Sequence, residues 1–394
     1  MKLIKLLNLI RKVKFFFSNP KKNNLLIFDD TSIKDFEHVL KNKKYFVLKT
    51  RHEQMTEIFI SLKIIFYMVK YINRNIFISY FIAVIKTTNT KVVLTTIDNC
   101  YRFHKIAKIL INDNINFIAV QNAARYDFKK NDLLFSRNLT KFNPNDQFLV
   151  PNYYCFGDEE EKDCRRLNIN VTKFYKHGSL RLSNYLEYFK KNKISIEKNY
   201  YDISILSEAN TGLDALWSQE GINEKFSILP KLIIKYCIKH KLKFLFITKR
   251  EVGEYQTQEM NFYKKYLSIN EYDYLLKNTM QVDKKNFASY QAIHRSNLVV
   301  GSISTMLRDK LALQGKILAC NFTDFDFYDF PQKGICFMKK PSYKEFEERV
   351  SNILKMKIDE YFTRCDNIRL ININSSKLTF DYINDHLDKL LKTT

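Results

Sequence analysis

Short apolar segments alternate with amphipathic ones along most of the chain, and this alternation limits the fold more than any other feature. Segments such as residues 25–28, 92–96 and 242–247 are built mainly of aliphatic, β-branched and aromatic residues. Strands that are apolar on both sides belong to parallel sheets whose two faces are covered by helices. The sequence therefore predicts an α/β fold.

Two series of such segments are separated by a polar stretch at residues 190–199. A chain of 394 residues is long enough to bury two hydrophobic cores. We therefore predict two Rossmann-like domains that face a cleft. The N-terminal domain covers residues 1–190; the C-terminal domain covers residues 200–394 and includes the helices predicted near the chain end.

Glycine is scarce, with only 8 in the whole chain. A dinucleotide-binding domain needs G-x-G-x-x-G after its first strand, and a P-loop needs G-x-x-x-x-G-K followed by Ser or Thr. Neither motif occurs. The sequence thus argues against hydride transfer and against P-loop chemistry.

The formal net charge is +23, and most of the 65 basic residues are Lys. Lys, Asn, Ile, Phe and Tyr are abundant together, which is typical of an AT-rich genome, so part of the charge reflects codon usage. A cationic surface attracts phosphates and anionic lipid. Nucleic acid is not a predicted partner, because the basic residues are dispersed rather than clustered as Arg among exposed aromatic residues.

The 7 Cys are odd in number and never spaced as C-x-x-C. This pattern argues against a disulfide framework and against a zinc site, and it favours a reducing cytoplasm. The string Asp324-Phe325-Asp326 matches a metal-binding D-x-D motif, but it comes too late in the chain for such a site. We predict no metal.

The N-terminal segment, residues 1–17, is both basic and apolar and lacks a signal-peptide cleavage site. Its apolar side chains share one helical face: Leu3, Leu6, Leu7, Ile10 and Val13. This pattern is typical of a helix on anionic lipid, here the inner membrane, or of a first helix packed on its own domain. The later apolar segments, residues 58–69 and 75–85, are too short to span a bilayer. The predicted location is cytoplasmic, with peripheral contact to the inner membrane.

The most informative motif lies at residues 297–320, where a strand ends at Gly301 and a helix follows. A small residue at the strand end lets a ligand approach the backbone, and Ser302, Ser304 and Thr305 lie at the helix start. Hydroxyl groups there can cap the helix, and its free N–H groups attract phosphate. The alternative is a capped strand–helix–strand unit without a ligand.

This segment resembles the nucleotide-sugar motif of glycosyltransferases with the GT-B fold, especially those that make bacterial surface polysaccharides. In that motif a Ser-Thr pair opens a helix, and an acidic residue and a Gly follow. The resemblance implies donor binding by Ser304-Thr305, with Asp309 in the acidic place and Arg308 at a phosphate. Asp309 departs from the Glu that is usual there.

Four further strings resemble a family of surface-carbohydrate or O-antigen biosynthesis proteins. In chain order they are Ile97-Asp98-Asn99, Gln121-Asn122-Ala123, Phe156-Gly157 and Gly178-Ser179. Ala123 replaces the Gly of that family. Together the resemblances cover roughly residues 90–330 and imply an acceptor domain followed by a donor domain.

Four of the predicted site residues in the first domain follow predicted strands and meet at the carboxyl edge of the sheet. Asp98 is the predicted base, because an inverting transfer needs a carboxylate to take the acceptor proton; its alternative role is an Asx cap. Asn99, Gln121, Asn122 and His177 are predicted to bind the acceptor, with turn capping as the alternative for the amides.

In the second domain, two loops follow the first and second predicted strands. Glu208, Thr211 and Gly212 are placed to bind ribose, sugar or phosphate. Lys249 and Arg250 would neutralise a leaving nucleotide, unless they form a solvated basic turn.

These observations predict a metal-independent glycosyltransferase that needs no cofactor. It would move a sugar from a nucleotide-activated donor, with CMP slightly favoured, to a lipopolysaccharide, O-antigen or capsule acceptor. Two alternatives stay open: transfer of polyol phosphate from CDP-glycerol, and a non-catalytic assembly protein.

Overall fold

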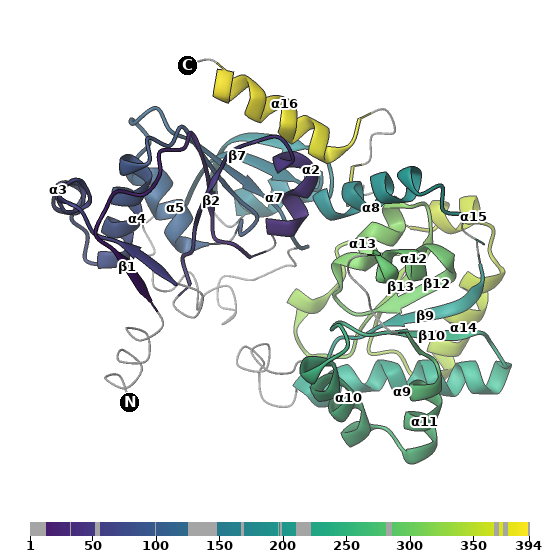
Figure 1. Ribbon diagram of the computed structural model, residues 1–394. Coiled ribbons are helices and arrows are strands. Elements are labelled where there is room, and N and C mark those ends of the chain that lie inside the picture. The colour runs from purple at the N-terminus through teal and green to yellow at the C-terminus, as the bar shows by residue number, and fades with distance from the viewer. Residues whose placement is uncertain are drawn as a thin grey trace. The chain divides into compact units, whose positions relative to one another are not determined.

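The computed structural model describes residues 13–31, 33–51, 56–98, 100–124, 148–166, 169–195, 197, 199–209, 222–280, 286–365, 370–372 and 377–392. The chain divides into two compact units (Figure 1). Unit 1 comprises Met1–Asn122, Arg137–Asn184 and Asn372–Thr394; unit 2 comprises Ala123–Ser136 and Tyr185–Ile371. Each unit contains a parallel sheet of six strands with helices on both faces, so the predicted α/β class is confirmed.

The sheet of unit 1 has the strand order β3-β2-β5-β6-β7-β8, and every neighbouring pair is parallel. Its strands in chain order are β2 (Leu25–Phe28), β3 (Phe46–Leu48), β5 (Val92–Thr95), β6 (Asn116–Val120), β7 (Phe148–Cys155) and β8 (Ile169–Lys176). A small second sheet pairs β1 (Lys14–Phe16) in parallel with β4 (Glu57–Phe59).

Helices cover both faces of the unit 1 sheet. They are η1 (Ile33–Phe36), α2 (Glu37–Leu40), α3 (Leu62–Lys70), α4 (Ile76–Thr87), α5 (Tyr101–Ile109), α7 (Asp158–Arg166) and α16 (Thr379–Lys392). Helix α8 (Leu180–Lys191) begins in unit 1 and belongs to unit 2 from Tyr185 on. On one face, Phe81 of α4 and Phe103 of α5 pack in a core with the strands. On the other, Phe36 and Ile383 share a second core with them, and Figure 1 shows α16 beside α2.

The sheet of unit 2 has the strand order β11-β10-β9-β12-β13-β14, again entirely parallel. Its strands are β9 (Tyr201–Leu206), β10 (Phe244–Ile247), β11 (Thr279–Met280), β12 (Ser296–Gly301), β13 (Lys316–Asn321) and β14 (Phe337–Lys339). Its helices are α9 (Ile222–His240), α10 (Glu254–Tyr266), α11 (Ile269–Lys277), α12 (Ala288–Arg295), α13 (Thr305–Ala312), η3 (Asp326–Tyr328), α14 (Tyr343–Lys355) and α15 (Ile358–Thr363). Helices α12 and α13 lie on one face, and α9, α10 and α11 lie on the other (Figure 1).

The C-terminal segment differs from the sequence prediction. We expected residues 200–394 to form one domain, but Asn372–Thr394 belongs to unit 1. Phe380, Ile383 and Leu387 of α16 are buried in the second core of that unit. An amphipathic pattern shows that one helix face is buried, but it does not show against which sheet.

Strand β7 is continuous and contains Pro151 in its interior. The pairing of β7 with β6 begins at Asn152, one residue after the proline, so the missing N–H of Pro151 interrupts no bond to β6.

At the N-terminus, residues 1–12, where an interfacial helix is predicted, lie outside the described residues. Among the helices that are described, none is long and apolar enough to cross a membrane.

Truncation of Ile383 tests the placement of α16. The side chain is fully buried, so Ile383→Ala is expected to lower the free energy of unfolding of unit 1 by about 2–5 kcal/mol. Hydrogen exchange should become faster in the strands of unit 1 and stay unchanged in those of unit 2. The matched control, Lys389→Ala on the exposed side of the same helix, should change stability by less than about 0.5 kcal/mol. Faster exchange in β9 or β12 instead would contradict the placement.

Candidate functional site

In unit 2, the loops after β9 and β12 are joined by one half-buried carboxylate. Glu208 follows β9, and its Oε1 accepts hydrogen bonds from the backbone N–H groups of Ser302 at 3.4 Å and Ile303 at 3.1 Å. Burial raises the pKa of the Glu208 carboxyl, while the positive charge of Lys249 and the backbone N–H groups act in the opposite direction. Glu208 therefore accepts hydrogen bonds from backbone N–H groups that were predicted to bind a phosphate.

The Ser-Thr pair lies at the start of α13, as the sequence predicts. Ser304 is the N-cap, and its hydroxyl accepts a hydrogen bond from the N–H of Met306. The Thr305 hydroxyl accepts one from the N–H of Ala124, a residue of the same unit, at 2.8 Å. Gly301, at the end of β12, has the Leu307 side chain 3.4 Å from the place of a Cβ, so it is closely packed.

The loop after β10 is fixed in the same way as the loop after β12. The Glu259 carboxylate, from α10, accepts hydrogen bonds from the backbone N–H groups of Lys249 at 2.8 Å and Arg250 at 3.1 Å. Glu259 is almost completely buried, and burial raises its pKa. The Lys249 side chain is exposed and its charge acts on Glu208, so positive charge lies at this edge of the sheet.

Two predicted donor contacts lie in the interior instead. The side chains of Arg308 and Asp309 are fully buried, and the Tyr290 hydroxyl of α12 donates a hydrogen bond to Asp309 at 3.0 Å. Both were predicted to contact the donor because they follow the Ser-Thr pair. On a helix as short as α13, the sequence pattern does not show which side chains face a ligand and which face α12. Thr211 and Gly212 lie outside the described residues.

In unit 1, Asp98 lies after β5 and is largely buried. Its Oδ2 accepts a hydrogen bond of 2.9 Å from the Tyr153 hydroxyl of β7, and its backbone oxygen lies 2.7 Å from Nε2 of His104. Cys100 is the N-cap of helix α5, and no side-chain hydrogen bond caps that helix. The Tyr153 contact thus fixes the orientation of the carboxylate. Asn99 lies outside the described residues.

Gln121 is buried between two loops. Its Oε1 accepts a hydrogen bond from the N–H of Phe156 at 2.9 Å, and its Nε2 donates to Glu160 of α7 at 3.2 Å. Glu160 in turn accepts from the N–H of Gly157 at 3.0 Å. Gln121 therefore connects the loops after β6 and β7, while Asn122, beside it, is half-buried.

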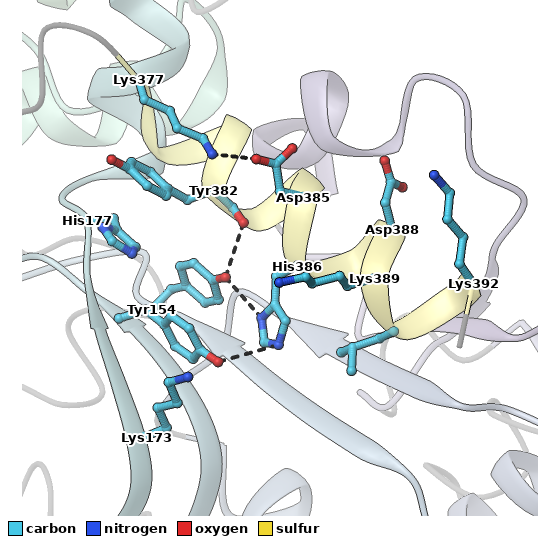
Figure 2. A pocket seen from close by; sticks show the side chains of 12 residues that line it. Tyr154, Lys173, His177, Lys377, Tyr382, Asp385, His386, Asp388, Lys389 and Lys392 are labelled. Atoms are coloured by element: carbon cyan, nitrogen blue, oxygen red, sulfur yellow. Dashed lines mark hydrogen bonds and ion pairs between the residues drawn. The ribbon is translucent and has the colours of Figure 1, made fainter. Parts of the chain in front are cut away.

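His177, a predicted acceptor residue, lines a pocket of about 940 Å³ between β8 and α16 (Figure 2). Its ring stacks on Tyr382 with the centroids 3.8 Å apart. Tyr154 and Tyr175 stack on each other at 4.5 Å, and His386 lies between their hydroxyls, with Nδ1 3.0 Å from Tyr154 and Nε2 3.4 Å from Tyr175.

The pocket is rich in lysine. Lys377 forms an ion pair with Asp385 and lies over the Tyr382 ring, and Lys173 lies over the ring of Tyr175. Burial lowers the pKa of both pocket histidines, and the neighbouring lysine charges add to this effect. Of the pocket residues, only His177 was predicted from the sequence. The one local signal for the others is the four-residue spacing that puts Tyr382 and His386 on one helix face.

The D-x-D string holds no cluster of ligands. Asp324 and Asp326 are exposed and form ion pairs with Lys340 and Lys339. Within the described ranges, no group of three or more His, Cys, Asp or Glu side chains is placed to hold a metal ion.

Comparison with known proteins gives a match only at the level of structure. No protein-family model and no curated protein sequence matches the chain. The UDP-GlcNAc 2-epimerase of Methanocaldococcus jannaschii, in complex with UDP-GlcNAc and UDP, is similar with a TM-score of 0.52 and 10% identity, over 94% of this chain and 99% of that one. The proposed UDP-N-acetylglucosamine 2-epimerase of Listeria monocytogenes gives 0.50 and 7%, over 94% and 96%. The wall teichoic acid polymerase TagF gives 0.49 and 13%, over 95% and 90%.

At such low identity the likeness concerns the fold. Together with the two parallel sheets, it confirms the prediction of two Rossmann-like domains of the GT-B type. Membership of a surface-carbohydrate family stays a prediction.

The buried histidines predict a loss of stability in acid. Burial lowers the pKa of His104, His177 and His386, so below the ordinary histidine value of about 6.5 the unfolded chain takes up protons that the folded chain does not. The stabilisation is complete above that pH and is lost as the pH falls toward the lowered values. Urea unfolding at about pH 7.5 and about pH 5.5 measures it; His104→Gln should reduce the slope by at most about 1.4 kcal/mol per pH unit. An unchanged slope in this variant would exclude His104 as a contributor.

Proposed function

We propose that the protein is a glycosyltransferase in which unit 2 binds a nucleotide-activated sugar and unit 1 binds the acceptor. The observation that carries the proposal is the carboxyl edge of the unit 2 sheet. There, two carboxylates, the half-buried Glu208 and the buried Glu259, accept hydrogen bonds from backbone N–H groups and so fix the loops after β12 and β10. These fixed loops and the exposed side chain of Lys249 offer a preformed place for a nucleotide phosphate.

The chemistry of the leaving group supports this reading. Departure of a nucleotide from the anomeric carbon leaves negative charge on a phosphate oxygen, and the side chains of Lys249 and Arg250 can stabilise that charge without a metal. The similar structure from Methanocaldococcus contains UDP-GlcNAc and UDP, which makes nucleotide sugars the first ligands to test. CMP-activated sugars are the donors that the Ser304-Thr305 motif favours, and a lipopolysaccharide, O-antigen or capsule glycan is the proposed acceptor.

Asp98 is the proposed base. As the acceptor oxygen attacks the anomeric carbon, its proton passes to the Asp98 carboxylate and the bond from that carbon to the phosphate oxygen breaks. Tyr153 positions the carboxylate through its 2.9 Å hydrogen bond. Gln121 lies at the same edge of the sheet. Its buried amide connects the loops after β6 and β7 and so fixes their positions.

Nucleotide binding is tested by thermal shift with CMP, UDP, GDP, CDP and CDP-glycerol. One nucleotide is expected to raise the unfolding temperature of the wild type, by RT ln(1 + [L]/Kd) in free energy. The double variant Ser304→Ala with Thr305→Ala should lose that response, while Thr257→Ala, an exposed hydroxyl on α10, should keep it. A response to CDP-glycerol and not to CMP would favour polyol-phosphate transfer, and no response to any nucleotide would refute the donor site.

Asp98 is tested by single-turnover transfer with the donor identified in that screen. Asp98→Asn keeps the size of the side chain and a hydrogen-bond acceptor for Tyr153, and is expected to lower the rate of transfer by about 10²–10⁴-fold. Tyr153→Phe should lower it less and change the pH profile, because the hydroxyl only positions the carboxylate. Nucleotide binding should be normal in both variants; transfer by Asp98→Asn at the wild-type rate would exclude Asp98 as the base.

A further inference from the structure

Helix α3 is apolar on two sides, and only one side is covered. Ile64 is fully buried, and Tyr67, Met68 and Tyr71 on the same side pack against the core behind α4. The opposite side carries large apolar side chains that are open to solvent: Leu62 at 88%, Ile65 at 49%, Phe66 at 60% and Val69 at 67% exposure. Surface helices of soluble domains normally place polar residues on this side.

The exposed surface continues beyond the helix. Ile72 and Ile76, which follow α3 in the chain, are 83% and 65% exposed. At the other end, Ser61, the N-cap of α3, donates a hydrogen bond of 2.6 Å to Asn19, just after the exposed Phe17. Exposed apolar side chains gathered in this way mark an interaction site. We call the four exposed side chains of α3 together with Ile72 and Ile76 the α3 face.

Positive charge borders this face. Lys63 and Lys70 are seven residues apart and therefore lie on the same flank of the helix, and Arg74 is exposed just beyond it. From Ile58 to Ile97 the chain contains no Asp or Glu. An apolar face with basic residues at its border complements the acyl chains and anionic headgroups of a lipid surface.

We propose that the α3 face docks unit 1 onto an anionic lipid bilayer, with its apolar side chains at the headgroup boundary and the lysine ammonium groups among the lipid phosphates. A second copy of the chain fits less well, because a two-fold contact through this face brings Lys63 and Lys70 of both copies together. This docking is independent of the proposed catalytic function and uses different residues from the predicted N-terminal helix.

Vesicle flotation with the full chain tests the docking. The wild type should float with vesicles of phosphatidylethanolamine and phosphatidylglycerol, and less with phosphatidylcholine or at high salt. Leu62→Asp with Phe66→Asp should reduce partitioning by about tenfold or more per side chain. Lys63→Gln with Lys70→Gln should remove the preference for anionic lipid. The matched control is Val252→Asp with Ile269→Asp, two exposed apolar residues of unit 2, which should float like the wild type.

Three results would overturn the proposal. The first is wild-type flotation by Leu62→Asp with Phe66→Asp, with unchanged unfolding temperature. The second is loss of flotation only when Lys2, Lys5, Arg11 and Lys12 are changed to Gln, which would assign docking to the N-terminal segment. The third is a dimer in lipid-free sedimentation equilibrium that Phe66→Asp dissociates, which would assign the α3 face to a second copy.

Discussion

The structure depends on burying two parallel sheets on both faces. Strands such as β2, β5 and β13 have every residue buried, so their side chains on either side must pack against helices. Polar chemistry is then confined to the strand ends, where the chain leaves the core. Because parallel strands end at one edge, this constraint brings Glu208, Lys249 and Ser304 to the same edge of unit 2, although they are far apart in sequence.

The loops at these edges are held by buried or half-buried side chains rather than by glycine-rich turns. Glu208 bonds the loop after β12, Glu259 the loop after β10, and Gln121 with Glu160 the loop after β7. A buried carboxylate costs several kcal/mol unless hydrogen bonds to its charged form offset the loss of water. Each of these carboxylates accepts at least one backbone N–H, which fixes loop geometry in a chain with only 8 Gly.

Unit 1 combines a buried polar edge with two unusual outer surfaces on opposite faces of its sheet. On the α16 side, stacked tyrosines, two histidines and lysines line the pocket that contains His177. On the other side, α3 exposes aliphatic and aromatic side chains beside lysines. Part of the net charge of +23 therefore lies on lysines at these two surfaces. A lysine beside an apolar or aromatic group favours anionic ligands that also carry apolar surface.

The sequence by itself determined the class of the fold and the positions of most elements. Strands β2, β5 and β10 lie within the apolar segments at residues 25–28, 92–96 and 242–247, because a strand that is buried on both sides needs apolar side chains of its own. Only the tertiary structure decided which surfaces meet. It placed α16 with unit 1, turned Arg308 and Asp309 inward, and paired Glu208 with the loop that begins at Ser302. These outcomes depend on contacts between residues that are distant in the chain. Local periodicity shows that one face of a segment is buried, but it does not show which other segment packs against that face.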